Sequence, residues 1–395
     1  MSFDPRSLLR RLWPFGRRGP GGVPAGTLAP ETFLTRQDLL RRNVEDVFVV
    51  RQAGGRGHGF VFAGDLLVTP ARALSLLEPR FRLHGYTPFL SREGGLTWIQ
   101  ALPLAAVTGR ARPVVNLLLF VLTALSTLLA GWFFVGSPTF DALRSAPDWT
   151  RLLAGVPFAG TLLAILGTHE FGHYFAARHH GAPVSLPYFV PAPPPLFLFG
   201  TLGAVIRMRA PARDRNALFD IAVAGPLAGL AVAVPALVLG LGWSRIVTGS
   251  IQGQIVFGNS LLYDLVIGFW FGRIPEGAML LTHPIADAAW AGLFVTALNL
   301  FPLGQLDGGR IAYALFGAHH RKVSVATFAA LVALGLATGS PNWYVFAGLV
   351  AVLIGFDHAP PLDAMTRLSP GRRVLGALSL LLLVLLVPPV PISLP

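Results

Sequence analysis

Apolar residues dominate the chain from Pro113 onward, in stretches long enough to cross a lipid bilayer. A transmembrane helix needs about 20 predominantly apolar residues, and the pattern predicts about seven such helices. They are expected near residues 114–134, 157–177, 217–240, 284–302, 323–339, 342–356 and 374–391. The chain is therefore expected to be a polytopic α-helical membrane protein, whose membrane domain covers residues 113–395.

Residues 31–110 have a mixed pattern that is typical of a domain outside the membrane. Strand-like runs occur at 44–50, 59–64, 65–70 and 96–104, and helical runs at 33–42 and 71–78. We predict a small cytoplasmic α/β domain over residues 31–110. Residues 1–30 combine arginine clusters with a Gly/Pro-rich piece and are expected to form a flexible basic tail.

One apolar segment, LPYFVPAPPPLFLFGTLGAVIRM at 186–208, has too many prolines for a helix. Non-helical backbone is tolerated at membrane depth only where it is buried in protein or lines a cavity. The second half of the segment alternates and is rich enough in β-branched residues to form one arm of a hairpin. We predict a re-entrant β-like loop that enters from the cytoplasmic side.

The composition supports a membrane protein, since 53% of the residues are hydrophobic and 13% are charged, against about 25% charged in a soluble domain. With the N-terminus cytoplasmic, 27 of the 31 Lys and Arg residues fall on that side and 4 on the other, as the positive-inside rule requires. The chain has a net charge of +12, and this distribution indicates that its basic residues contact lipid headgroups and not nucleic acid. The N-terminus lacks the apolar core of a signal peptide, so a prokaryotic plasma membrane is the expected location, and an organelle precursor is the alternative.

Three ionisable residues, His169, Glu170 and His173, stand inside the second predicted span and spell H-E-x-x-H. Two histidines four residues apart share one face of a helix, so both imidazoles can bind one divalent ion. Glu170 is then placed to polarise a water bound to that ion. Ionisable groups at membrane depth are costly without a role, which favours a metal site over chance. The chain has no cysteine, so the ligands of any metal must be His, Asp or Glu.

A catalytic zinc usually has three protein ligands and an open fourth position, so a third ligand is required. The acids near the predicted spans are Asp220, Asp287 and Asp307. The first two stand where helices begin, a place that acids occupy for the helix dipole alone. Asp307 follows a segment broken by Pro302 and Gly304, and from such a segment it can point at the histidines. Asp307 is the predicted third ligand.

The motif HEFGH together with NLFPLGQLDGG resembles the site-2 protease family of intramembrane zinc metalloproteases. The strings FGTLGAVIRM and AGPLAG are similar to that family's re-entrant loop and third-helix signature. The resemblance covers about residues 155–320, the expected catalytic core. Residues 243–283 are too short for a PDZ-like insertion, and a cytoplasmic domain precedes the core. This layout is similar to the plastid and cyanobacterial-type branch of the family.

The resemblance implies one Zn²⁺ ion per chain, bound by His169, His173 and Asp307. Glu170 would act as general base and then as proton donor to the leaving amine. Asn299 matches an asparagine thought to position the substrate or to stabilise the oxyanion; the alternative is that it is only a helix-breaking turn residue. The implied reaction is hydrolysis within or near the transmembrane segment of a single-pass membrane protein.

A helical substrate hides its amides in its own hydrogen bonds and must be unwound before hydrolysis. The predicted loop offers an edge to which an extended substrate can add as a strand. The residues expected to form this edge are Gly200, Thr201, Leu202, Gly203, Ala204 and Val205. The expected partners are therefore a transmembrane substrate and the lipid bilayer, without nucleic acid; the sequence sets no oligomeric state.

Two other functions use the same residues. A metal-ion transporter could bind its cargo with the His, Asp and Glu cluster, but transporters often show internal repeats, and the HEFGH motif has no second copy. A catalytically inactive scaffold would have no need of Glu170, which serves hydrolysis and has no evident binding role. The transporter is kept as the alternative function.

Overall fold

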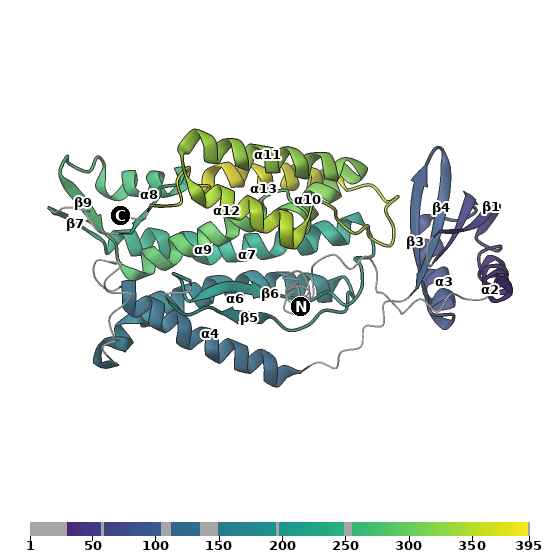
Figure 1. Ribbon diagram of the computed structural model, residues 1–395, viewed down its shortest axis with the longest axis horizontal. Coiled ribbons are helices and arrows are strands. Elements are labelled where there is room, and N and C mark those ends of the chain that lie inside the picture. Colours follow the sequence, from purple (N-terminus) through teal and green to yellow (C-terminus); the bar gives the residue numbers. More distant parts are fainter. Residues whose placement is uncertain are drawn as a thin grey trace, which may run out of the picture.

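The computed structural model describes residues 30–56, 59–103, 112–134, 149–194, 197–248 and 255–393. The predicted tail over residues 1–30 lies outside these ranges except for its last residue. The described residues form a small α/β unit and a larger helix bundle (Figure 1). At the end of the bundle farthest from the α/β unit lies a two-stranded antiparallel sheet of β7 (Arg245–Thr248) and β9 (Ala278–Leu281).

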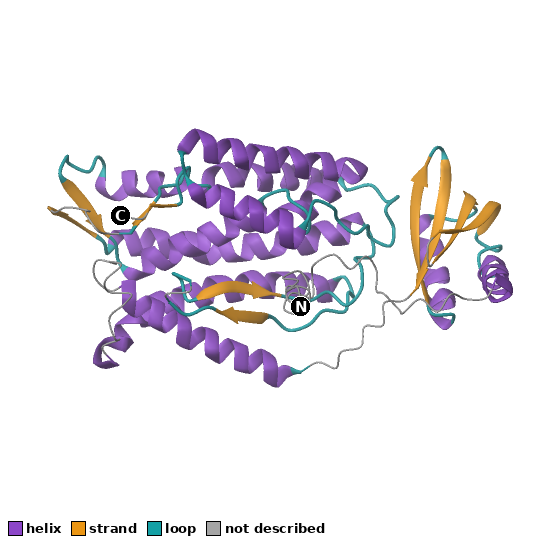
Figure 2. Cartoon of the chain, viewed as in Figure 1, coloured by secondary structure: helices purple, strands orange, loops and turns teal. Residues whose placement is uncertain are grey.

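The α/β unit is a four-stranded antiparallel sheet with two helices, and its strand order is β1-β2-β4-β3 (Figure 2). Its elements are α2 (Pro30–Arg42), β1 (Phe48–Arg56), β2 (Gly59–Leu66), α3 (Pro70–Leu83), β3 (Tyr86–Glu93) and β4 (Leu96–Pro103). The sheet and helices share a core that includes the fully buried side chains of Phe60, Leu77 and Phe81. This core is separate from that of the bundle and also includes Leu362, with Met365 packed against it.

Two details of the α/β unit differ from the sequence prediction. Residues 65–70 were expected to be a strand, but β2 ends at Leu66 and α3 begins at Pro70. The Thr69 side chain caps α3 by accepting a hydrogen bond from the Arg72 N–H, and Pro70 suits the first helical position. Strand β3 was not predicted, because Pro88 and its polar neighbours weaken the strand signal; it is an edge strand of the four-stranded sheet, where proline is tolerated.

A short extended segment, 362–364, joins the α/β unit to the bundle. On one side it pairs with Leu90 of β3, since the Leu90 N–H donates to the Leu362 carbonyl (2.7 Å) and the Ala364 N–H to the Leu90 carbonyl (3.0 Å). On the other side the Leu362 and Asp363 N–H groups donate to the carbonyls of 212 and 213 (2.9 and 2.8 Å). The segment thereby links the edge of the sheet to the chain that leads into the bundle.

The bundle consists of helices whose positions match the apolar stretches of the sequence. Its elements are α4 (Pro113–Phe134), the 3-10 helix η1 (Trp149–Gly155), α6 (Val156–His179), β5 (Tyr188–Pro191), β6 (Thr201–Val205), α7 (Arg215–Gly242), β8 (Val256–Phe257), α8 (Leu261–Phe271), α9 (Pro284–Leu300), α10 (Asp307–Phe316), the 3-10 helix η2 (Gly317–His319), α11 (His320–Thr338), α12 (Pro341–Leu349), the π-helix η3 (Val350–Ile354), α13 (Pro370–Leu386) and β10 (Ile392–Ser393). The described part of the chain is thus mostly helical.

Within the described ranges, four helical segments are long and apolar enough to cross a membrane. They are Pro113–Phe134, Leu152–His179, Arg215–Gly242 and Asp307–Thr338; three shorter apolar helices accompany them at Leu261–Phe271, Pro284–Leu300 and Pro341–Ile354. Large apolar side chains on these helices point outward, as lipid contact requires: Leu117, Leu265 and Leu336 are all more than 60% exposed. The seven-span topology itself stays a prediction.

The segment 186–208 forms a hairpin, as its pattern indicated. Strands β5 and β6 pair antiparallel, with Tyr188 opposite Val205 and Phe189 opposite Ala204. The hairpin lies beside α4 and α6 (Figure 1). At its turn end, an added Cβ on Gly200 would lie 2.4 Å from the Ser126 carbonyl oxygen, so only glycine permits this close approach to α4. The turn of the hairpin is thereby packed against α4.

Phe133 and Phe134 stand at the end of α4, where aromatic side chains commonly anchor a helix at the membrane interface, but they are not exposed. Phe133 and Phe134 are buried in the main core of the bundle. The Phe134 ring stacks on Phe158 of α6, with centroids 4.8 Å apart, and on Phe199 of the hairpin. These rings fix α4, α6 and the hairpin against one another because each contributes to the same aromatic cluster.

Candidate metal centre

The α6 helix carries all three residues of the H-E-x-x-H motif on its buried side. His169, Glu170 and His173 are only 4%, 6% and 3% exposed. One ligand atom from each lies within 4.8 Å of the others, as four-residue spacing on a helix predicts. The motif is therefore gathered at one point inside the bundle.

Asp307 reaches that point from 138 positions further along the chain. Its Oδ2 lies 3.2 Å from His169 Nε2 and 3.1 Å from His173 Nε2. Asp307 is the first residue of α10, which begins directly against the end of α9: an added Cβ on Gly308 would lie 1.8 Å from the Leu300 carbonyl oxygen. The structure thus places the predicted third ligand beside both histidines.

The donor set fits a tetrahedral metal ion. The Ile221 carbonyl lies 2.6 Å from His173 Nδ1, so Nδ1 carries the proton and Nε2 has only a lone pair to offer. That lone pair faces His169 Nε2 at 3.1 Å and the Asp307 carboxylate. Because these atoms can all accept, a bound cation would stabilise them at this short separation. Two ligands of a tetrahedral zinc ion lie about 3.3 Å apart, since each bond is about 2.0 Å. The observed triangle is close to one face of that tetrahedron.

Glycines on α7 allow the centre to form. An added Cβ on Gly225 would lie 2.2 Å from His173 Nε2, and one on Gly229 would lie 3.3 Å from His169 Nδ1. The AGPLAG signature at 224–229 therefore brings the α7 backbone against the histidine rings. Helix α7 also supplies the Ile221 carbonyl that orients His173. These glycines act through packing and need no chemical role.

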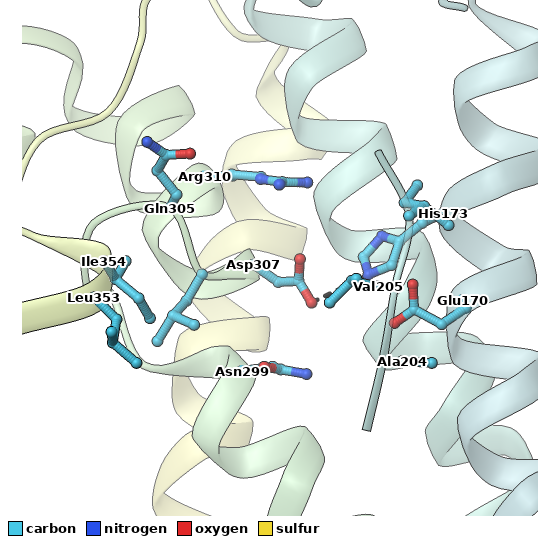
Figure 3. Close-up of a pocket in the computed structure, with 12 residues that line it drawn as sticks. Glu170, His173, Ala204, Val205, Asn299, Gln305, Asp307, Arg310, Leu353 and Ile354 are labelled. Atoms are coloured by element: carbon cyan, nitrogen blue, oxygen red, sulfur yellow. Dashed lines mark hydrogen bonds and ion pairs between the residues drawn. The ribbon is translucent and has the colours of Figure 1, made fainter. Parts of the chain in front are cut away.

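A pocket opens beside the histidines and is drawn in Figure 3. Glu170 lines it, together with Ile206 just beyond β6. Asn299 of α9 lines the same pocket and points toward Glu170 in Figure 3. A carboxylate thus lines this pocket next to the candidate ligands His173 and Asp307.

The hairpin residues predicted to bind substrate divide into two groups. Ala204 and Val205 line the pocket. Thr201 is buried and its hydroxyl donates to the Val190 carbonyl, Gly200 contacts α4, and Leu202 is 57% exposed. Of the six residues, including Gly203, the structure brings only Ala204 and Val205 to the pocket.

The two remaining candidate acids lie elsewhere. Asp220 forms a two-point ion pair with Arg372 (2.7 Å for both contacts) and accepts from His180 at 2.9 Å. Asp287 is buried at the start of α9, where it accepts a hydrogen bond from the Thr282 hydroxyl. Asp287 thus stands in the first turn of its helix, as expected, whereas Asp220 does not, because α7 begins at Arg215 and Asp220 lies in its second turn.

Arg310 also lines the pocket, and sequence reasoning did not select it. It had been counted only among the bases that set the topology. A signal was available, because Arg310 stands three residues after Asp307 and residues with that spacing share a helix face.

Comparison with known proteins points to one family. Residues 157–339 match Peptidase family M50. The chain is 35% identical over 234 residues to "Probable zinc metalloprotease EGY2, chloroplastic" of Oryza sativa subsp. indica, covering 58% of this chain and 39% of that protein. It is 32% identical over 386 residues to "Probable zinc metalloprotease EGY2, chloroplastic" of Arabidopsis thaliana, covering 90% and 65%. No solved structure matches the chain.

The family match confirms the resemblance drawn from the motifs, since residues 157–339 contain both HEFGH and LDGG. The match and the apolar helices together make the chain an integral membrane protein. The chain spans 39% of the length of the rice relative and 65% of the Arabidopsis one. Both carry chloroplastic names, which conflicts with the expected prokaryotic plasma membrane.

Proposed function

The chain contains a domain of peptidase family M50, and on this premise we propose that it is a zinc-dependent endopeptidase acting on transmembrane segments. The observation that carries the proposal is the meeting of two imidazoles and one carboxylate at 3.1–3.2 Å, with Glu170 beside them. Zinc is the proposed ion because the ligand set is His₂Asp and because the relatives are named zinc metalloproteases.

The proposed ligands are His169, His173 and Asp307. When bound, the ion would supply a water of lowered pKa and would polarise the scissile carbonyl. Glu170 takes a proton from the attacking water at its carboxylate, while the water oxygen forms a bond to the carbonyl carbon. Glu170 then gives the proton to the amide nitrogen as the C–N bond breaks. Its burial beside the ligands keeps this carboxylate within reach of both atoms.

We further propose that the substrate binds as an added strand on β6. One edge of β6 pairs with β5, and within the described residues its other edge has no strand partner. Ala204 and Val205 lie on that strand and line the pocket with Glu170 and His173. An extended substrate paired there would present its backbone carbonyls to the metal ligands.

A proline at position 204 or 205 tests this edge. Ala204→Pro and Val205→Pro remove one N–H each, so we expect slower cleavage with unchanged zinc content. Leu202→Ala, on the same strand but outside the pocket, is the control and should cleave at the wild-type rate. Normal cleavage by both proline variants would exclude strand addition.

The proposed substrate is a single-pass membrane protein, and the proposed topology has the α/β unit on the cytoplasmic side of the bilayer. The positive-inside distribution of the bases supports this orientation. As to the compartment, the sequence favoured a prokaryotic plasma membrane and the names of the relatives favour a plastid. The proposal needs only what these two locations share, a lipid bilayer.

Metal removal and restoration tests the function. The purified protein, in lipid vesicles with a set of single-pass segments, is stripped with a chelator and then reloaded with zinc. We expect cleavage to vanish and return with one zinc per chain. Stoichiometric zinc without cleavage of any segment would favour the metal-ion transporter, and a protein that binds no metal would exclude both functions.

A further inference from the structure

Arg310 lines the pocket at the candidate metal centre. It follows Asp307 by one helical turn on α10 and lines the same pocket as Glu170 and His173. In Figure 3 the Arg310 and Asn299 side chains reach into the pocket on either side of Asp307. An arginine is therefore placed next to the proposed metal ligands and the proposed base.

The guanidinium of Arg310 has donors to spare. Other arginines of the chain have carboxylate partners, such as Arg80 with Asp46 and Arg372 with Asp220. For Arg310, no side-chain hydrogen bond or ion pair is formed within the described ranges. Up to five N–H donors are thus available to an oxygen in the pocket.

A cluster of aromatic and imidazole rings lies near Arg310, whose charge acts on His358. The rings of Tyr313, His320 and His358 contact one another there, with centroids 5.0–5.9 Å apart. Burial lowers the pKa of His358 to about 3, and the nearby charge of Arg310 adds to this effect, so the imidazole is neutral. These rings offer Arg310 no negative charge, and Asp357, which acts on His320, pairs with Arg321.

We infer, on the basis of the proposed peptidase function, that Arg310 binds the oxygen of the scissile carbonyl and stabilises the negative charge that develops on it. When the water oxygen bonds to the carbonyl carbon, the π electron pair moves to the carbonyl oxygen, which accepts from the guanidinium. The pair returns to re-form the carbonyl as the C–N bond breaks and Glu170 protonates the amine. Arg310 is thus a catalytic residue, and Asn299 is placed to assist from the opposite side of Asp307.

Substitution of Arg310 tests this role through the separation of kcat from KM. Arg310→Gln should lower kcat by about 10²–10³-fold, the usual effect of removing one oxyanion donor, with little change in KM or zinc content. Arg310→Lys keeps the charge but loses the planar guanidinium group. Its kcat should therefore lie between those of the wild type and Arg310→Gln. Arg321→Gln is the matched control, because it removes a base at the same membrane edge from a side chain that is 72% exposed. Its kcat should equal that of the wild type.

A second measurement guards against a variant that simply folds poorly. Arg310→Ala should regain part of its cleavage rate when guanidinium is added at low concentration, and sodium at equal ionic strength should have no effect. A structural role for Arg310 would give no such rescue.

Three results would overturn the inference while the proposed function stands. One is wild-type kcat in Arg310→Gln. Another is a rise in KM confined to substrates with an acidic residue near the cut, since Arg310 would then recognise a side chain. The third is an equal loss in Arg321→Gln, which would show a general effect of charge. A wild-type protein that loads zinc but cleaves nothing would instead defeat the proposed function, and this inference with it.

Discussion

Adding one methyl group to Gly225 should disable the metal centre. The Cβ of an alanine there would lie 2.2 Å from His173 Nε2, whereas ordinary van der Waals contact begins at 3.4 Å. The ring or the α7 backbone must therefore move by about 1.2 Å, the difference between these distances. The ring has little freedom, because its Nδ1 is held by the Ile221 carbonyl at 2.6 Å. Any movement separates Nε2 from the other two ligand atoms.

The expected loss has two parts. Misorienting a ligand typically lowers metal affinity by about 10–100-fold. Overpacking a tight helix contact costs about 1–3 kcal/mol of stability. Gly225→Ala is therefore expected to bind zinc at least tenfold more weakly and to lower the unfolding midpoint. Zinc affinity is measured by competition with a chromophoric chelator, and stability by thermal unfolding in detergent.

Two other glycines provide graded controls. At Gly229 the added Cβ would lie 3.3 Å from His169, so a shift of a few tenths of an ångström suffices and affinity should change little. At Gly160 of α6 no atom lies within 4 Å, so Gly160→Ala should bind zinc normally and gain up to about 1 kcal/mol from helix propensity. Wild-type affinity in Gly225→Ala would refute the reasoning, as would equal losses in all three variants.

Two further predictions concern the regions around the site. His358 stays neutral in the fold, with a pKa of about 3 against 6.5, so the unfolded chain binds a proton that the folded chain does not; stability is present above pH 6.5 and is lost as the pH falls toward 3. When unfolding midpoints are measured against pH, the decrease at acid pH should be smaller in His358→Gln than in the wild type and unchanged in His319→Gln. The same decrease in His358→Gln and in the wild type would contradict this prediction. Asp363 is 2% exposed and accepts from the Met365 and Thr366 N–H groups, so Asp363→Ala should cost about 1–3 kcal/mol and speed hydrogen exchange at the Leu90 amide. Unchanged exchange at Leu90 would mean that the turn does not support the attachment of the α/β unit.

The sequence was most informative where the chemistry is local or costly. The H-E-x-x-H spacing fixes the face of α6 by helix geometry alone. Asp307 was predicted although it is far away in the chain, because a charged residue on a broken apolar segment needs a partner. The hairpin at 186–208 followed from its prolines and alternation. In each case the other possible structures would have a high free energy, so few structures were compatible with the sequence.

Prediction failed where the outcome depends on packing between distant segments. Phe133 and Phe134 have the composition of an interfacial belt, and only the position of Phe158 and Phe199 shows that they are buried. The pairing of Leu90 with Leu362 joins segments that no periodicity relates. Arg310 was overlooked because the positive-inside rule already gave it a role, and one residue can satisfy two constraints.

The most direct test of the account compares the wild type with Glu170→Gln. The amide replaces the carboxylate with nearly the same shape, so the three proposed ligands His169, His173 and Asp307 are left in place. Both proteins are assayed in parallel for bound zinc and for cleavage of single-pass segments in lipid vesicles. The account predicts one zinc per chain in both and cleavage by the wild type alone. Cleavage by the variant at the wild-type rate would contradict it, and so would a wild type that holds no zinc.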